Sequence, residues 1–482
     1  MLKTPFWWRT TVEERPFEGR VRNTRFKPGF SPCGALKPSC PYDRCLVYDM
    51  GLIIQESKER GIMRIHIALI AAFALTISLT ALSHAQTETT LYSFTGASDG
   101  YLPFGGLVFD AAGSLYGTNY FGGTINGSCP VGCGTVFQLT QSGGAWTFNT
   151  LHSFAGDATD VGHSYAHVTF DPHGNLFGTG GTGGGPADCY SGESCGGVFE
   201  LSRSNAWKET IIFSFTPNTG LTPYSGLTFE KGSFYGTTWF GPGSKRVVGD
   251  GTVYSLSLGK NGLWNQAIVH SFTGGSDGYE PTADLVFDQH GHLYGSTPYG
   301  GTDQAGDVFE LNRANTGWTL NLIDNANAST LIVDKSGNLY GSSSGGGSSN
   351  CQGGCGTVFK LQHTATGWRQ TTLYEFTDTT DGFVPGALVF DAEGNLYGTT
   401  MLGGTGTCEF FQYPGCGTVF KLAPAKGSWQ KTTLYNFIGG TDGEFPNGNA
   451  LVMDSSGSLY GATLGGATYG SSGYGTIYEI RP

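Results

Sequence analysis

Residues 388–400, Leu-Val-Phe-Asp-Ala-Glu-Gly-Asn-Leu-Tyr-Gly-Thr-Thr, decide the fold of this chain, because variants of this stretch occur seven times. The variants begin at Leu107, Val168, Leu227, Leu285, Leu331, Leu388 and Leu451. Each combines a short apolar segment, a turn and a second segment of the Leu-Tyr-Gly-Thr type. In the turn, Asp bonds to its own backbone and Gly accepts a positive φ, as a tight hairpin requires. The stretch therefore predicts a β-hairpin that recurs at intervals of about 57 residues.

Two further segments complete each repeat. One resembles Gly-Thr-Val-Phe-Lys-Leu at 417–422, and the other begins with Trp, as in Trp-Arg-Gln-Thr-Thr-Leu-Tyr-Glu-Phe at 368–376. All the segments are rich in β-branched and aromatic residues, and no stretch of 86–482 shows a sustained helical period. Four antiparallel strands per repeat, repeated radially, predict an all-β, seven-bladed β-propeller. Aromatic residues at matching positions are expected to fill the wedges between blades.

The two ends of residues 86–482 provide an independent test of this fold. The last repeat stops after its third strand, at Tyr478-Glu479-Ile480, and lacks the segment that begins with Trp. An unaccompanied fourth strand, Thr90-Leu91-Tyr92-Ser93-Phe94, stands at the beginning. Pairing this strand with the last blade would close the ring and remove two exposed sheet edges. We therefore predict a closed propeller rather than an open solenoid.

The repeat resembles a known family. The segments Gly-Asn-Leu-Tyr-Gly-Thr-Thr at 394–400 and Gly-Thr-Val-Phe-Lys-Leu at 417–422 are similar to the GloVer tandem repeat of exported bacterial proteins. The resemblance covers residues 90–482 in seven copies. It implies an extracellular repeat protein and implies no established activity.

The first 85 residues differ from the repeats. Residues 63–85 have the form of a secretory signal peptide, with Arg64, an apolar run from Ile67 to Leu82 and a small-x-small cleavage site at 83–85. Since a signal peptide normally begins a chain, we interpret 1–62 as an upstream extension translated from a wrongly chosen start codon. A genuine cytoplasmic extension before a signal anchor is the alternative. The mature domain is expected to be 86–482, secreted or periplasmic, and monomeric.

The charge of the mature domain excludes some partners. Residues 86–482 contain 14 Lys and Arg and 31 Asp and Glu, which gives a formal charge of −17. A chain with so few cations cannot neutralise a phosphate backbone, so we expect neither nucleic acid nor an anionic membrane surface as a partner.

The eight cysteines of the mature domain form four close pairs. The pairs are Cys129 with Cys133, Cys189 with Cys195, Cys351 with Cys355, and Cys408 with Cys416. A zinc site made from two pairs is the alternative to disulfides. Each pair occupies the same place in a different repeat and no His recurs beside them, so we predict four local disulfides in an exported protein.

An Asp-Gly motif followed by Pro recurs where one blade leads into the next. Its aspartates are Asp99, Asp277, Asp381 and Asp442. The structural interpretation is a turn, in which Asp caps the backbone and Gly takes a positive φ. The functional interpretation is a ring of carboxylates that binds Ca²⁺ or a cationic or hydroxylated ligand. No other cofactor and no catalytic residue is predicted, because no phosphate-binding loop, haem motif or catalytic triad is evident.

Six aromatic residues in the predicted loops break the repeat pattern and are candidates for a ligand platform. They are Tyr120, Phe121, Trp239, Phe410, Phe411 and Tyr413. The alternative is that each ring packs across its own loop.

Two functions are consistent with the sequence: a binding module for an extracellular glycan or protein, and a propeller enzyme that acts on an extracellular polysaccharide. Binding is favoured, because the functional-looking residues repeat with the blades and form no singular catalytic cluster.

Overall fold

The computed structural model describes residues 86–481, except 188, 190–193, 243–249, 302–303, 316, 352, 378, 411–412 and 467–472, and the side chains of 449–450. The predicted upstream extension at 1–62 and the predicted signal peptide at 63–85 lie outside the described residues. Within the described part of the chain, no helix is long and apolar enough to cross a membrane.

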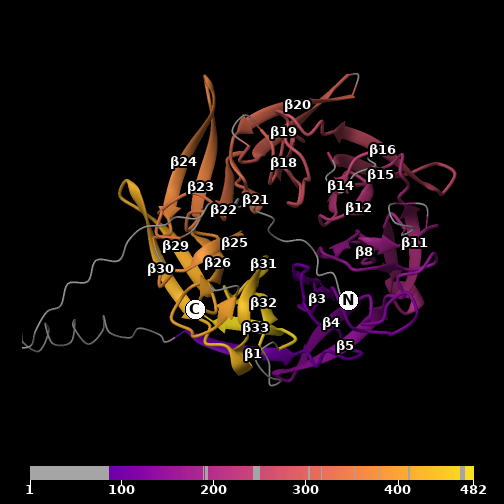
Figure 1. Cartoon of the computed structure of the whole chain (residues 1–482), viewed down its shortest axis with the longest axis horizontal. Helices are drawn as coiled ribbons and strands as arrows, with labels where there is room; N and C mark the ends of the chain where they lie inside the picture. Colours follow the sequence, from indigo (N-terminus) through magenta and orange to yellow (C-terminus); the bar gives the residue numbers. More distant parts are fainter. Residues whose placement is uncertain are drawn as a thin grey trace, which may run out of the picture. The chain divides into compact units, whose positions relative to one another are not determined.

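Seven main sheets follow one another around a ring, so the protein is an all-β, seven-bladed β-propeller, as predicted (Figure 1). In each blade the strands are antiparallel, with the first near the centre of the ring and the fourth at its rim. Blade 1 consists of β2 (Val108–Phe109), β3 (Leu115–Asn119), β4 (Thr135–Ser142) and β5 (Ala145–Ser153). Blade 2 consists of β7 (Thr169–Phe170), β8 (Leu176–Gly180), β10 (Gly197–Ser202) and β11 (Lys208–Ser214). Blade 3 consists of β13 (Thr228–Glu230), β14 (Ser233–Phe240), β15 (Thr252–Leu258) and β16 (Trp264–Ser271), with β12 (Leu221–Pro223) also paired to β14.

The remaining four blades repeat this plan. Blade 4 consists of β17 (Val286–Phe287), β18 (Leu293–Thr297), β19 (Asp307–Ala314) and β20 (Gly317–Asp324). Blade 5 consists of β21 (Thr330–Val333), β22 (Leu339–Ser343), β23 (Thr357–Thr364) and β24 (Gly367–Glu375). Blade 6 consists of β25 (Phe383–Phe390), β26 (Leu396–Leu402), β29 (Thr418–Ala425) and β30 (Ser428–Asn436). Blade 7 consists of β31 (Glu444–Met453), β32 (Leu459–Gly465), β33 (Thr476–Arg481) and β1 (Thr87–Ser93).

The predicted closure of the ring is confirmed. Strand β1 pairs antiparallel with β33, so that Thr87 lies opposite Arg481 and Ser93 lies opposite Thr476. Figure 1 shows the two strands, from opposite ends of the sequence, side by side in the same blade. The first strand of the domain thus completes the last blade and covers the edge that β33 would otherwise expose.

The register of the second and third strands explains the glycine of the Leu-Tyr-Gly-Thr segment. In every blade this glycine lies opposite the aromatic residue of the third strand. The pairs are Gly117–Phe137, Gly178–Phe199, Gly236–Tyr254, Gly295–Phe309, Gly341–Phe359, Gly398–Phe420 and Gly461–Tyr478. In blade 5 a Cβ atom on Gly341 would lie 2.5 Å from Cζ of the fully buried Phe359. The glycine is therefore needed because the ring lies across the neighbouring strand.

Aromatic rings fill the wedges between blades, as predicted. A Phe after the fourth strand of one blade makes an edge-to-face contact with the third-strand aromatic of the next blade, with ring centroids 5.0–5.4 Å apart. These pairs are Phe94–Phe137, Phe154–Phe199, Phe215–Tyr254, Phe272–Phe309, Phe376–Phe420 and Phe437–Tyr478. Such pairs stabilise the interface beyond the burial of their area.

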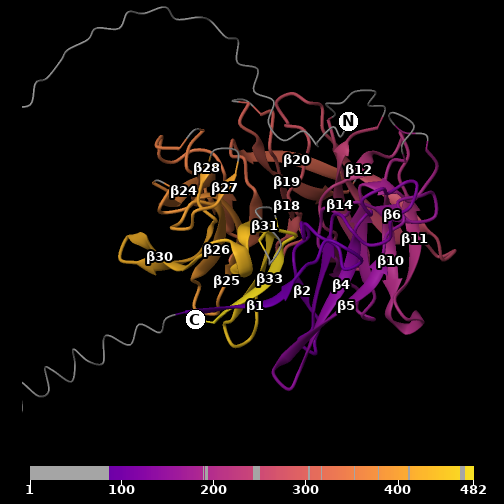
Figure 2. The same cartoon turned by 60° about the horizontal axis from the view of Figure 1, so that its bottom comes forward.

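The two faces of the ring differ. Because neighbouring strands run in opposite directions, the connections between second and third strands emerge on the same side as the connections into the next blade. We call this side the loop face. Figure 2 shows the small sheet β27 (Glu409–Phe410) and β28 (Tyr413–Pro414) on the upper side of the ring, and the long β4–β5 hairpin projecting below.

The four predicted disulfides are confirmed, and each lies in a connection between a second and a third strand. They join Cys129 to Cys133, Cys189 to Cys195, Cys351 to Cys355 and Cys408 to Cys416. Each therefore constrains a loop on the loop face.

Removing one disulfide should destabilise the protein measurably. Replacing both Cys351 and Cys355 by Ala is expected to lower the free energy of unfolding by about 2 kcal/mol, because the bond restricts the unfolded chain. Denaturant unfolding of the oxidised proteins would measure the loss. Wild-type protein treated with reductant is the control, and its loss should exceed that of the variant because four bonds are broken. Equal stability of the oxidised variant and the oxidised wild type would contradict the prediction.

Candidate functional site

A pocket of about 260 Å³ lies on the loop face where blades 1, 2 and 3 meet. We call it the tyrosine pocket. Its described lining comprises Tyr120, His163, Tyr165, Gly181, Thr182, Cys189, Ser194, Leu221 and Thr222. Tyr120 follows β3, and His163 and Tyr165 lie between β6 (Val161–Gly162) and β7. Leu221 and Thr222 belong to β12. The pocket is thus built by loops and short strands held on three adjacent blades.

Four aromatic rings form a continuous row beside and within this pocket. The rings of Tyr120 and Tyr165 have centroids 4.5 Å apart, and their hydroxyl oxygens are 2.7 Å apart. Tyr165 stacks on Tyr224 with centroids 4.3 Å apart and planes 22° apart. Tyr224 in turn makes an edge-to-face contact with Trp239, with ring centroids 5.3 Å apart. The row brings together aromatic residues from the first three blades.

This row arises because one position of the repeat differs between the two halves of the ring. The residue three places before the first Leu or Val of each repeat is aromatic in blades 1 to 3, namely Phe104, Tyr165 and Tyr224. In blades 4 to 7 the same position holds Thr282, Ala328, Pro385 and Gly448. Large rings therefore accumulate on one side of the loop face. The seven-fold pattern is broken there.

The polar groups of the tyrosine pocket carry no formal charge. His163 Nδ1 lies 2.9 Å from the hydroxyl of Thr182. Burial lowers the pKa of His163 to about 4, so its imidazole is neutral at physiological pH. Burial, together with the neighbouring Tyr120, raises the pKa of Tyr165, so the phenol keeps its proton. The described lining contains no Asp, Glu, Lys or Arg. Such a site suits a neutral, hydroxylated ligand better than an ion.

The backbone around His163 is held in an uncommon conformation. His163 has φ +55°. Its N–H donates to the carbonyl oxygen of Cys133 at 2.8 Å, and its own carbonyl accepts from the N–H of Gly181 at 3.2 Å. Since Cys133 belongs to a disulfide of blade 1, the imidazole is positioned by contacts to two blades. A left-handed non-glycine residue with such support often marks a functional site.

The structure separates the predicted platform aromatics into two groups. Tyr120 and Trp239 belong to the aromatic row, and Phe121 contacts both Tyr120 and Tyr101.

The second group lies on the other side of the ring, where the centroids of Phe410 and Phe445 are 5.2 Å apart and those of Tyr413 and Phe383 are 5.6 Å apart. These two rings pack against the first strands of blades 6 and 7, β25 and β31. Phe411 lies outside the described residues.

The structure places the Asp-Gly carboxylates within their own turns. Asp99 accepts hydrogen bonds from the N–H and hydroxyl of Thr95 and from the hydroxyl of Tyr92. The other three aspartates make similar contacts to the same turn and to the outermost strand of the preceding blade. The contacts join Asp277 to Thr273 and His270, Asp381 to Thr377 and Tyr374, and Asp442 to Ile438 and Tyr435. The geometry supplies a turn-capping role at each position, and it does not gather these carboxylates into one cluster.

Sequence reasoning missed three residues of the site: His163, Tyr165 and Tyr224. Tyr165 and Tyr224 could have been found from the repeat alignment, since they replace the small residues of the other blades. His163 stands near His167 and His173 in the sequence, but this local cluster gives no reason to place its imidazole in a pocket on the loop face. Its side chain lines the pocket because its backbone has φ +55°, a conformation that the sequence does not predict.

Comparison with known proteins supports the repeat and the fold. The model of the Gloeobacter/Verrucomicrobia repeat matches residues 190–411 and 319–482. A fungal alcohol oxidase of the AA5 family, solved in complex with copper, is similar over 83% of this chain and 77% of its own, with 12% identity and a TM-score of 0.52. At this identity the likeness shows the propeller fold alone.

Two other solved structures are more distant. The extracellular domain of a proposed one component system from B. thetaiotaomicron is 10% identical over 82% of this chain, with a TM-score of 0.46. This chain spans 40% of that structure's length. A gluconolactonase from Xanthomonas campestris is 10% identical over 82% of this chain and 89% of its own, with a TM-score of 0.39. A search of curated proteins found no match.

Proposed function

The chain belongs to the Gloeobacter/Verrucomicrobia repeat family, and from this premise we propose that it is an extracellular binding module for a neutral carbohydrate. The observation that carries the proposal is the tyrosine pocket, where stacked aromatic rings stand beside uncharged hydrogen-bonding groups. Sugars present C–H faces that pack on aromatic rings, and hydroxyl groups that bond to Tyr, Thr and neutral His. Four disulfides and the signal peptide predicted at 63–85 support an exported location.

Hydrolysis of a polysaccharide is the competing function. A typical glycosidase places two carboxyl groups on either side of the scissile bond. The described lining of the tyrosine pocket contains neither Asp nor Glu. Binding without cleavage is therefore the function that this geometry supports best.

Neutral oligosaccharides should bind the oxidised protein at the tyrosine pocket. We expect at least one hexasaccharide in a panel of gluco-, galacto- and manno-oligosaccharides to raise the melting temperature, because a ligand stabilises the native state by mass action. Tyr165→Ala should weaken that ligand at least tenfold in titration calorimetry, because it removes the ring between Tyr120 and Tyr224. Tyr299→Ala is the matched control. Its ring stacks on Tyr279 in blade 4, outside the pocket, and binding should be unchanged.

The melting temperature of each ligand-free variant separates loss of binding from loss of fold. A ligand that binds wild type and Tyr165→Ala equally would place the site elsewhere. If no oligosaccharide binds, the carbohydrate proposal fails, and a protein partner becomes the candidate for this face.

A further inference from the structure

A three-residue contact recurs at the rim between neighbouring blades. It joins a residue of one fourth strand, the aspartate of the following connection and a residue of the next blade's fourth strand. We call it the interblade trio. Between blades 5 and 6 its members are Tyr374, Asp381 and Lys431: the hydroxyl of Tyr374 donates to Asp381 at 3.0 Å, and Nζ of Lys431 donates at 2.8 Å. The Lys431 side chain is only 5% exposed. Here a buried cation neutralises the aspartate.

Between blades 1 and 2 the same three positions hold His152 of β5, Asp160 and Glu209 of β11. His152 Nε2 lies 3.1 Å from Oδ2 of Asp160 and 3.5 Å from Oε2 of Glu209. One nitrogen or oxygen atom from each residue lies within 4.8 Å of the other two. The side chains are 21%, 12% and 7% exposed, respectively. Glu209 thus replaces the lysine, and two carboxylates face one imidazole.

The Glu209 carboxylate contacts Asp160 and the backbone of Val161, but one of its oxygens is left without a partner. Its Oε1 atom is buried and has no hydrogen-bond partner among the described residues. Its Oε2 atom is directed at His152. Leaving a carboxylate oxygen buried without a partner is costly, and a cation held between these side chains would satisfy it.

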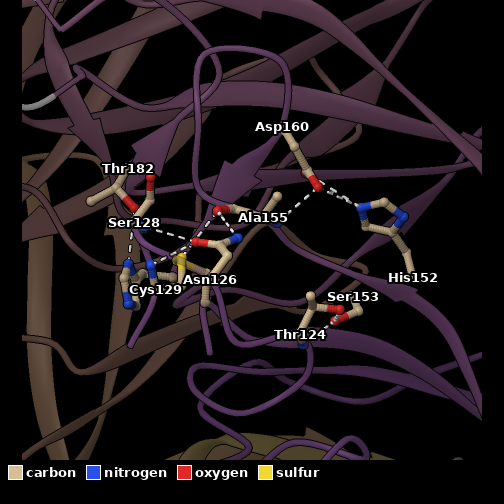
Figure 3. The surroundings of a disulfide bond; sticks show 11 residues. Thr124, Asn126, Ser128, Cys129, His152, Ser153, Ala155, Asp160 and Thr182 are labelled. Carbon is tan, nitrogen blue, oxygen red and sulfur yellow. Dashed lines mark hydrogen bonds and ion pairs between the residues drawn. A yellow bond between two sulfur atoms is a disulfide. The ribbon is translucent and has the colours of Figure 1, made fainter. Parts of the chain in front are cut away.

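The surrounding loops hold Asp160 of the trio in place. The N–H of Ala155 donates to Oδ2 of Asp160 at 2.8 Å, and Nδ2 of Asn126 donates to the carbonyl oxygen of Ala155 at 3.0 Å (Figure 3). Asn126 stands just before the loop that the disulfide between Cys129 and Cys133 closes, and its Oδ1 accepts from the N–H of Cys129 at 2.8 Å. Figure 3 shows His152 and Asp160 pointing toward each other beside this loop. The Asp160 carboxylate is therefore held in position by the surrounding loops.

We propose that His152 Nε2, Asp160 and Glu209 bind a divalent transition metal ion, with Zn²⁺ as the best match, and that the ion joins blade 1 to blade 2. One imidazole and two carboxylates are ligands that Zn²⁺ accepts, whereas Ca²⁺ and Mg²⁺ prefer oxygen alone. Ligand atoms around a tetrahedral zinc ion lie about 3.4 Å apart. This is close to the 3.1 Å and 3.5 Å that separate His152 Nε2 from the oxygens of Asp160 and Glu209. Three protein ligands would leave one position for water.

The other trios provide the contrast. Between blades 6 and 7 the trio consists of Tyr435, Asp442 and Glu88, so a phenol takes the place of the imidazole. In the trio after blade 3, His270 lies 3.4 Å from Asp277, and the third position holds Leu320. Only the blade 1 and blade 2 trio, among those that the structure describes, combines an imidazole with two carboxylates.

Zinc titration of the oxidised full chain tests this proposal. The variants are His152→Tyr and Glu209→Gln. Tyr should be tolerated at 152, because Tyr92, Tyr374 and Tyr435 occupy this position in other blades and bond to their aspartates. Both variants should bind one equivalent of Zn²⁺ fewer than wild type, or bind it at least tenfold more weakly. Zn²⁺ should raise the melting temperature of wild type more than that of either variant.

His270→Tyr is the matched control, since it makes the same exchange in a trio with only one carboxylate. It should retain the zinc stoichiometry of wild type. The proposal is overturned if His152→Tyr and Glu209→Gln keep the wild-type stoichiometry and affinity. It is also overturned if His270→Tyr causes the same loss, or if wild type binds no zinc at micromolar concentration. Melting of the metal-free variants shows whether each remains folded.

Discussion

Deleting residues 86–94 is expected to abolish cooperative unfolding of the propeller or to lower its melting temperature by more than about 10 °C. The deletion removes β1, which supplies the fourth strand of blade 7 and covers β33. It also removes Phe94, whose fully buried ring contacts Phe137 in blade 1. The variant would expose a long sheet edge and open the ring at one interface. Circular dichroism melting and light scattering would follow both effects.

A point substitution isolates the packing part of this effect. Phe94→Ala should cost about 3–5 kcal/mol, as is typical for removing a buried Phe. Thr89→Ala is the control on the same strand, because its side chain is exposed, and the change should be within about 0.5 kcal/mol. An unchanged melting temperature for the deletion variant would show that ring closure by β1 does not stabilise the protein.

Gly341→Val is expected to destabilise the protein by about 3 kcal/mol. Gly341 lies opposite Phe359, and the nearest atoms to an added Cβ all belong to that ring, the closest at 2.5 Å. The Phe359 ring is fully buried, so it could move away from the added side chain only by displacing its own neighbours. The expected cost is therefore one of overpacking. Denaturant unfolding, compared through the midpoint at a common slope, would measure it.

A double-mutant cycle identifies the cause. Phe359→Leu shortens the side chain that the new methyl groups would meet, so the double variant should be at least about 1 kcal/mol more stable than the sum of the single changes predicts. Gly337→Val is a useful comparison. A Cβ on Gly337 would meet no atom within 4 Å, so its cost would come from its φ of +77° alone and should not be relieved by Phe359→Leu. Additive changes in the Gly341 cycle would contradict the proposed role of the glycine.

The sequence alone was sufficient for the fold and for the disulfides. Seven copies of one hairpin predicted seven blades, and the displaced fourth strand at Thr90-Leu91-Tyr92-Ser93-Phe94 predicted the closure that β1 makes with β33. These features are local or are repeated many times, so each copy supports the interpretation of the others. The cysteine pairs were predictable for the same reason, since their members are only four to eight residues apart.

The aromatic row was predictable only in part. Tyr120 and Trp239 stood out as aromatics in predicted loops, although Trp239 in fact lies near the end of strand β14. Nothing in the sequence connected the two rings through Tyr165 and Tyr224. Those contacts depend on how the connections of three blades meet on the loop face. The position of the rings is therefore a property of the packed blades and not of any one repeat.

The interblade trio shows most clearly what only the tertiary structure decided. His152 and Asp160 lie close in sequence, whereas Glu209 is 57 positions from His152, in a different repeat. In a single repeat each of these residues has an ordinary role, as a strand residue or a turn-capping aspartate. The three side chains converge because the fourth strands of adjacent blades pack side by side, which brings residues one repeat apart within hydrogen-bonding reach. The sequence determined the seven blades, and the packing between blades determined which side chains share a site.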